Sequence, residues 1–152
     1  MARALGADGI IYSGDNDEKM LEGIEDVVDR WGGKFFVTYE SKGDKALAMH
    51  HRKGFSIVHL TMYGIPLQKK IKEIRKKKNV LIVVGGEKVW GNVYDQADYN
   101  IAVTNQPHSE IAALTLFLHE YFKGKELEKK FKGKIKIVPQ DHGKKVVNNE
   151  KE

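Results

Sequence analysis

The regular alternation of strand and helix patterns limits the fold of this sequence more than any other feature. Short apolar runs such as Val80–Val84 alternate with stretches such as Asp17–Trp31, in which apolar residues recur at helical spacing. Strands that are apolar and β-branched on both faces are typical of parallel sheets covered by helices. The pattern therefore predicts an α/β fold with a mostly parallel sheet and helices on both of its faces.

The predicted elements follow one another with short connections. Strands are expected at 8–13, 35–39, 56–60, 80–84, 98–103 and 134–138, and helices at 17–31, at 44–53, from Pro66 onward, at 109–122 and at 125–131. A chain of 152 residues with 41% hydrophobic content suits a single core. We therefore expect one domain over residues 1–140, followed by a polar, frayed tail over residues 141–152.

The composition bounds the class of protein. The sequence carries 26 Lys and Arg residues against 21 Asp and Glu residues, a formal net charge of +5. It has no cysteine, which excludes disulfides and thiolate metal sites, and no apolar run long enough to span a membrane. A soluble cytoplasmic protein is expected. The basic runs at 69–78 and 123–136 are either solvated faces or contacts for nucleic-acid phosphates.

Three loops that follow predicted strands share features of a ligand site. They are 60–64, the glycine pair Gly85–Gly86 with residues 87–89, and Thr104–Glu110. In open α/β sheets, small ligands bind at the carboxyl ends of the strands. The glycines permit close approach of a ligand to the backbone, and Pro107 stiffens its loop. These loops therefore predict a cofactor pocket, although a glycine pair after a strand is also a common plain turn.

Common catalytic and metal-binding motifs are absent from the sequence. There is no G-x-G-x-x-G, no phosphate-binding G-x-x-x-x-G-K-[ST] and no G-x-S-x-G. His119 and Glu120 lack the second histidine of a zincin motif, and the adjacent His50 and His51 would face different directions on a helix. No metal and no covalent nucleophile are therefore expected.

The predicted helix at 109–122 is apolar around much of its circumference. A helix of this kind is buried on more than one side. It is either a central core helix or a helix shared between the core and a dimer interface, and the sequence leaves both open.

Several strings carry a resemblance to one family. The main ones are VHLTMYG at 58–64, VGGEKV at 84–89 and ADYNIAVTNQPHSEIAAL at 97–114, with further matches at 3–9, 26–33 and 137–140. Together they closely resemble the archaeal tRNA (cytidine-56-2'-O-)methyltransferases of the SPOUT superfamily. The resemblance covers essentially the whole chain, and the string NQPHSE at 105–110 is its most specific part.

The resemblance implies a deep C-terminal trefoil knot, a homodimer and methylation of the ribose 2'-hydroxyl of cytidine 56 in the tRNA T-loop. It also implies that three knot loops hold S-adenosylmethionine, largely through backbone groups and without a metal. The matching cofactor-binding positions are Leu60, Gly85, Gly86, Glu87, Lys88, Val89, Val103, Thr104, Asn105, Gln106, Pro107, His108, Ser109 and Glu110. The candidates for ordering the reacting groups are Glu87, Asn105 and Ser109, although Ser109 could equally serve as a helix cap.

The start of the chain departs from the family pattern. Family members begin with about two dozen more residues, a first β-strand and an arginine-rich stretch, whereas Met1 here directly precedes Ala-Arg-Ala-Leu-Gly. The expected catalytic arginine is therefore missing, and Arg3 matches a different family position. We expect either an active methyltransferase or a catalytically impaired RNA- or cofactor-binding module that retains the knot.

Overall fold

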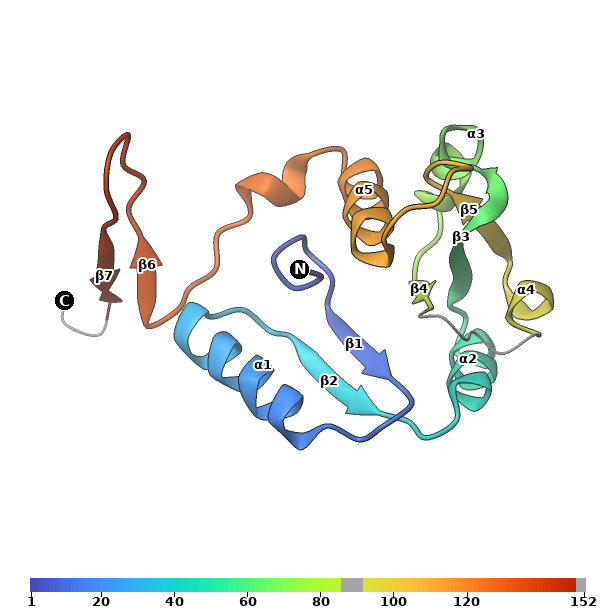
Figure 1. Cartoon of the computed structure of the whole chain (residues 1–152), viewed down its shortest axis with the longest axis horizontal. Helices are drawn as coiled ribbons and strands as arrows, with labels where there is room; N and C mark the ends of the chain where they lie inside the picture. Colours follow the sequence, from blue (N-terminus) through green and yellow to red (C-terminus); the bar gives the residue numbers. More distant parts are fainter. Residues whose placement is uncertain (86–91, 150–152) are drawn as a thin grey trace.

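The computed structural model describes residues 1–85 and 92–149 (Figure 1). The strands in these residues form three separate sheets. The strands are β1 (Gly9–Tyr12), β2 (Phe36–Tyr39), β3 (Ser56–Pro66), β4 (Val80–Val84), β5 (Tyr99–Ala102), β6 (Ile135–Ile137) and β7 (Val146–Asn148). The helices are α1 (Glu18–Trp31), α2 (Gly43–Arg52), α3 (Leu67–Ile74), α4 (Val93–Gln96) and α5 (Glu110–Phe122), with a 3-10 turn, η1, at Lys125–Glu128.

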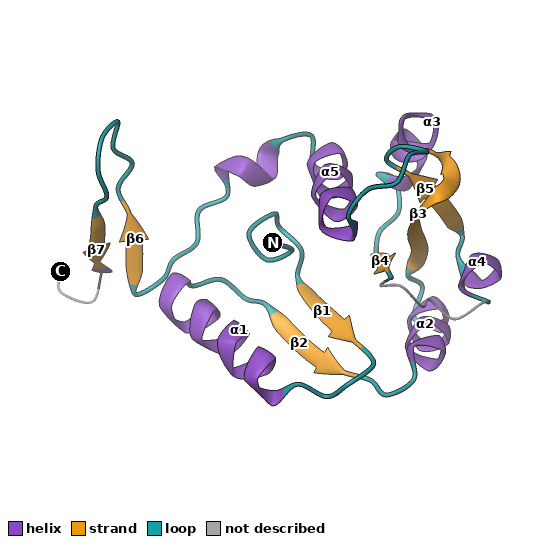
Figure 2. Ribbon diagram, viewed as in Figure 1, coloured by secondary structure: helices purple, strands orange, loops and turns teal. Residues whose placement is uncertain are grey.

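The central unit is a three-stranded parallel sheet in the order β4-β3-β5. One face of this sheet packs against α3 and α5 in a buried cluster that includes Leu60, Ile71 and Phe117. The other face packs against α2 and α4 through Leu47, Ile57 and Val93. Figure 2 shows these helices around the strands. The expected arrangement of helices on both faces of a parallel sheet is confirmed for this unit.

The unit formed by β1, α1 and β2 is less deeply packed. Its two strands pair in parallel, and α1 is capped by Asp17, whose side chain accepts a hydrogen bond from the Met20 amide at 3.0 Å. None of the residues of α1 is buried, and Phe36 on β2 is 53% exposed. Helix α1 ends at Gly32, which has φ of 74° and lies against the backbone of Lys132, so that no side chain fits there.

The prediction of one mostly parallel sheet is wrong in how the strands pair, because the described strands form separate sheets. Strands β1 and β2 form their own sheet, and β6 pairs in antiparallel fashion with β7 instead of lying at the edge of the main sheet. Because β7 lies at 146–148, the tail expected to fray is partly ordered. Alternating apolar and polar residues in β6 match a two-stranded hairpin as well as a sheet edge, and the sequence pattern does not distinguish them.

Other elements differ from the prediction in extent. Strand β3 runs on to Pro66, with an irregularity in its pairing to β5 between Leu60 and Ile65. The short helix α4 was not predicted, and the helix expected at 125–131 is a 3-10 turn that ends at Glu128.

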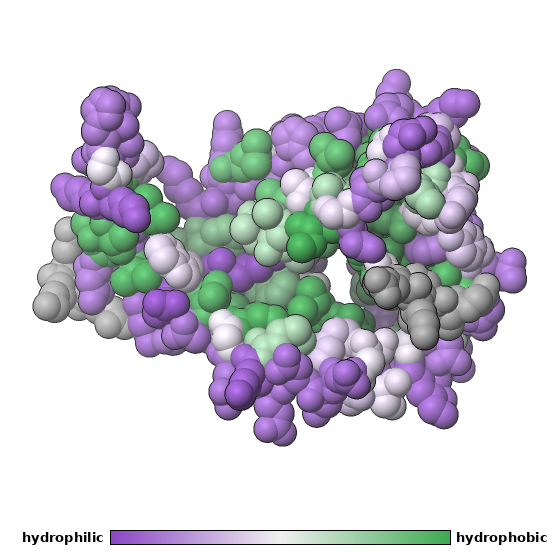
Figure 3. Space-filling view, viewed as in Figure 1, coloured by the Kyte–Doolittle hydropathy of each residue, from purple (hydrophilic) through white to green (hydrophobic). Residues whose placement is uncertain are grey.

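Apolar residues border a hollow in the middle of the face shown in Figure 3, between the two parallel sheets. Within the described residues, no helix is long and apolar enough to cross a membrane.

Candidate functional site

Strands β4 and β5 end close to Leu60 of β3, whereas β3 itself runs on to Pro66. Leu60 on β3 is in register with Val84 on β4 and with Ile101 on β5. Gly85 follows Val84 directly, and the loop from Val103 begins just after β5. Leu60, Gly85 and the start of the third loop are therefore close to one another in the sheet, and the cofactor pocket expected among the three loops stays a prediction. This is the edge of a parallel sheet where small ligands bind.

The side chain of Asn105 joins two of these loops. Its amide nitrogen donates to the Met62 carbonyl oxygen at 2.6 Å and to the Gly64 carbonyl oxygen at 3.1 Å. Gly64 itself lies so close to β5 that an added Cβ would come within 2.5 Å of the backbone of Asn100. The end of β3 and the loop after β5 are thus held together by hydrogen bonds and by close backbone packing.

The third loop ends in the cap of α5. The hydroxyl oxygen of Ser109 accepts a hydrogen bond from the Ala112 amide at 3.1 Å, and Glu110 occupies the first turn of the helix. His108 precedes this cap, and its Nδ1 lies 3.1 Å from the Ser109 carbonyl oxygen. Because a carbonyl only accepts, Nδ1 carries a proton, and in the neutral imidazole Nε2 is then an acceptor. Nε2 is buried and has no partner within residues 1–85 and 92–149.

The structure places the predicted site residues in three groups. Leu60, Gly85, Val103 and Asn105 are brought together by strand register and by the Asn105 hydrogen bonds. His108 of the third loop is half-buried, and the other predicted residues of this loop are exposed, namely Thr104, Gln106, Pro107, Ser109 and Glu110. The remaining predicted residues, Gly86, Glu87, Lys88 and Val89, lie outside the described residues.

A polar network on the face of β3 opposite to the Leu60 side chain was not predicted. His59 is buried, and its Nδ1 lies 2.9 Å from Oδ1 of Asn100 on β5. The Asn100 amide donates to the Tyr94 carbonyl oxygen at 2.9 Å, and the Tyr94 hydroxyl lies 3.0 Å from that of Thr61. The signal in the sequence was the pair of polar residues, His59 and Thr61, at alternate positions of an otherwise apolar strand.

The hydrogen bonds of this network define the state of His59. The Asn100 amide is used by Tyr94, so Oδ1 faces His59, and Nδ1 of His59 is the donor. Burial lowers the pKa of His59, and the hydrogen bond to Asn100 opposes this only in part. The ring of His59 also packs edge-on against Tyr94, with 4.7 Å between the ring centroids. His59 is therefore a neutral member of a rigid network.

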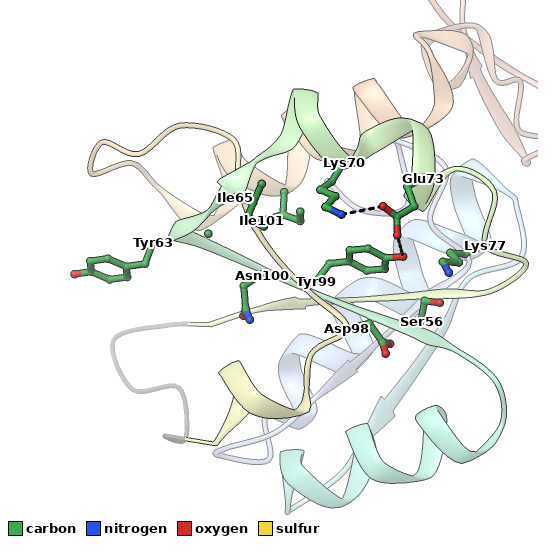
Figure 4. Close-up of a pocket in the computed structure, with 11 residues that line it drawn as sticks. Ser56, Tyr63, Ile65, Lys70, Glu73, Lys77, Asp98, Tyr99, Asn100 and Ile101 are labelled. Carbon is green, nitrogen blue, oxygen red and sulfur yellow. Dashed lines mark hydrogen bonds and ion pairs between the residues drawn. The ribbon is translucent and has the colours of Figure 1, made fainter.

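A cavity of about 600 Å³ lies beside the strand ends, along β5 and α3. Figure 4 shows Tyr99 pointing toward Glu73 on α3, while Asn100 points the other way. The Tyr99 hydroxyl donates to Glu73 at 2.7 Å, and this bond lowers the pKa of Glu73, whereas burial raises the pKa of Tyr99. Leu60, Gly85 and Asn105 do not line this cavity. It is therefore not the cofactor pocket predicted from the three loops.

Arg3 has a structural position far along the chain from these loops. Its guanidinium donates to the Gly32 carbonyl oxygen and lies over the ring of Phe131, 4.5 Å from the centroid. These contacts join the N-terminal turn, the end of α1 and the segment before β6.

Comparison with solved structures supports the fold. An RNA 2'-O ribose methyltransferase matches with a TM-score of 0.59 at 17% identity, covering 82% of this chain and 48% of that chain. The SpoU methyltransferase AviRb from Streptomyces viridochromogenes, solved in complex with AdoMet, matches with a TM-score of 0.57 at 17% identity, covering 82% and 52%. This chain spans about half the length of these two proteins. At this identity the likeness shows the α/β fold of SpoU-type methyltransferases.

Comparison with family models and curated sequences identifies the family. The family model described as "tRNA ribose 2'-O-methyltransferase, aTrm56" matches residues 31–147. A tRNA (cytidine(56)-2'-O)-methyltransferase of Pyrococcus horikoshii is 52% identical over 151 residues, covering 96% of this chain and 73% of the relative. One of Methanopyrus kandleri is 45% identical over 146 residues, covering 95% and 82%. The chain belongs to the tRNA ribose 2'-O-methyltransferase family that this model describes.

Proposed function

We propose that this protein transfers a methyl group from S-adenosylmethionine to the ribose 2'-hydroxyl of cytidine 56 in the T-loop of tRNA. The observation that carries the proposal is the convergence of Leu60, Gly85 and the Asn105 loop where β4 and β5 end, in a chain of this family. The target nucleotide comes from the names of the curated relatives.

The described residues fit S-adenosylmethionine in their chemistry. The cofactor carries an adenine amino group, two ribose hydroxyls and an ammonium group, all of which are hydrogen-bond donors, and His108 offers a buried acceptor without a partner among the described residues. The residues proposed to hold it are Leu60, Gly85, Val103–Glu110 and, outside the described residues, Gly86–Val89. When bound, the cofactor supplies an electrophilic methyl group on a sulfonium.

The protein's contribution to such a reaction is mainly alignment. Holding two reactants in line can lower a barrier by about 7–11 kcal/mol in favourable cases. The Asn105 amide is already engaged with two carbonyl oxygens, so we assign Asn105 to shaping the site. Ser109 accepts from the Ala112 amide, which leaves its hydroxyl proton free to donate toward the site. Glu87 remains a proposed ordering residue.

We further propose a deep trefoil knot formed by the third loop and the end of β3, and a homodimer. The packing of the Asn105 loop against the Met62 and Gly64 carbonyls supports the close crossing of these segments. Support for the dimer comes from α5, where Ile111 is 65% exposed and Leu116 is 51% exposed. Apolar side chains at such exposure on a helix favour an interface between copies.

The basic surface of α3 is the proposed contact for tRNA phosphates. Lys70 on this helix is already paired with Glu73, while Lys69 and Lys72 are exposed on the same helix. Lysines of this kind bind phosphates by counterion release, so binding is expected to weaken steeply as salt rises.

A methyl-transfer assay tests the proposed function. The protein is incubated with tritiated S-adenosylmethionine and a tRNA transcript, and the label is mapped to a nucleotide. Label at the 2'-oxygen of cytidine 56 is expected, and a transcript with 2'-deoxycytidine at that single position is expected to accept none. Equal labelling of the two transcripts, or calorimetry that shows no binding of S-adenosylmethionine, would overturn the proposal.

A further inference from the structure

We propose that Tyr94 is a positioning residue for the methyl-donor site, acting through Thr61, His59 and Asn100. This inference rests on the proposed function for its link to the cofactor. Tyr94 lies on α4, and its contacts reach the residues on either side of Leu60 and also Asn100, which pairs with His59 from the neighbouring strand β5. Its role is therefore to hold β3 and β5 together beside Leu60 rather than to touch the cofactor.

The geometry of a strand explains why contacts to His59 and Thr61 act on Leu60. Alternate residues of a strand point to opposite faces, so His59 and Thr61 share one face and Leu60 points to the other. Leu60 accordingly packs in the buried cluster with α3 and α5. Contacts that restrain His59 and Thr61 therefore also restrain the backbone of Leu60. They leave free the face of the strand to which the Leu60 side chain points.

Tyr94 contacts β3 and β5 through three of its groups: its hydroxyl, its ring and its backbone carbonyl. Its hydroxyl lies 3.0 Å from the Thr61 hydroxyl, and its ring packs edge-on against His59. Its carbonyl oxygen accepts from the Asn100 amide at 2.9 Å, and Asn100 in turn accepts from His59. One residue thus connects the middle of β3 with β5. A network in which each member is satisfied in this way makes a local structure rigid.

The burial of the contacts differs between the two ends of this network. Tyr94 is 41% exposed, but its neighbour Val93 is fully buried in the cluster that α4 forms with α2 and β3. On the strand side, Thr61 is 9% exposed and His59 is 2% exposed. Loss of the Tyr94 hydroxyl leaves the buried Thr61 hydroxyl without this partner, so its effect is expected on β3 around Leu60.

Two single variants and their combination test the proposal. Tyr94→Phe removes the hydroxyl and keeps the ring and the carbonyl, while Thr61→Val removes the partner hydroxyl at nearly constant volume. We expect each to raise KM for S-adenosylmethionine about threefold to tenfold, with kcat at saturation nearly unchanged. The double variant should be no worse than the worse single one, because both remove the same hydrogen bond. The matched control is Tyr121→Phe on α5.

Hydrogen exchange provides a readout that does not depend on the cofactor. In both single variants, exchange over residues 60–64 and 100–105 is expected to accelerate, while exchange over β1 and β2 stays as in the parent protein. Unchanged exchange over 60–64 and 100–105 would overturn the positioning role. Unchanged KM with a lower kcat in proportion to the folded fraction would do the same. If the parent protein binds no S-adenosylmethionine, the proposed function fails, and exchange alone judges the role of Tyr94.

Discussion

The amide nitrogen of Asn105 lies 2.6 Å from the carbonyl oxygen of Met62, although 43 residues separate them in the chain. This bond, with the second one to Gly64, makes the loop after β5 and the end of β3 one structure. Substitutions that break it should therefore act on both loops together.

Replacement of Asn105 by Ala should weaken cofactor binding more than stability. The two lost hydrogen bonds are exposed, so we expect a loss of about 0.5–1.5 kcal/mol in the free energy of unfolding. The affinity for S-adenosylmethionine, measured by calorimetry, should fall at least about tenfold because the loop is no longer preorganised.

Asn149 provides the matched control for this variant. Its amide donates to the Gly133 carbonyl oxygen at 2.9 Å, beside the β6–β7 hairpin. Asn149→Ala should cost a similar free energy of unfolding and leave the affinity for S-adenosylmethionine unchanged. Equal loss of affinity in the two variants would contradict a special role for Asn105.

Replacement of His108 by Phe should separate stability from binding. The buried Nε2 has no partner among the described residues, so its removal breaks no hydrogen bond there, and the substitution loses only the exposed Nδ1 bond to the Ser109 carbonyl oxygen. We expect the free energy of unfolding to fall by no more than about 1 kcal/mol, while the affinity for S-adenosylmethionine falls clearly. Thermal unfolding and calorimetry on the same samples measure the two effects, and unchanged affinity would show that Nε2 does not face the cofactor.

The stability of the protein should depend on pH through His59. Its pKa in the folded protein lies below the ordinary value, so between these two pKa values the unfolded chain binds a proton that the folded protein does not. Stability from this group is therefore fully present above about pH 6.5 and is lost as the pH falls toward the lower, folded pKa. Urea unfolding at several pH values measures it. In His59→Gln this part of the pH dependence should vanish, and an identical pH profile for the two proteins would refute the assignment.

Much of the central unit could be predicted from the sequence because its signals are local. Apolar β-branched runs indicated β4 and β5, and helical spacing of apolar residues indicated α1 in the neighbouring unit. The closeness of Leu60 to Gly85 followed from the rule that parallel strands bring such loops to one edge, although β3 runs on past Leu60 to Pro66.

The rest depended on contacts between distant segments. The hydrogen bonds of Asn105 to Met62 and of Asn100 to Tyr94 need a tertiary arrangement that no spacing in the sequence encodes. The pairing of β6 with β7 was missed because residues 141–152 carry too few apolar residues to mark a strand. The division into two parallel sheets is likewise set by packing, because strand patterns do not state which strands pair.

A methyl group added at Gly64 should disturb the crossing of β3 and β5. A Cβ there would lie 2.5 Å from the backbone of Asn100 and Ile101, and backbone cannot move aside as a flexible side chain can. We expect Gly64→Ala to lower the free energy of unfolding by about 1–3 kcal/mol, the usual cost of overpacking, and to abolish measurable binding of S-adenosylmethionine.

Gly23→Ala is the matched control, because Gly23 lies within α1 and a Cβ there meets nothing within 4 Å. Since Ala is a better helix former, Gly23→Ala should raise the free energy of unfolding by about 0.5–1 kcal/mol. Urea unfolding of both variants measures the difference in sign, and a neutral Gly64→Ala would mean that β3 and β5 separate at this point at little cost.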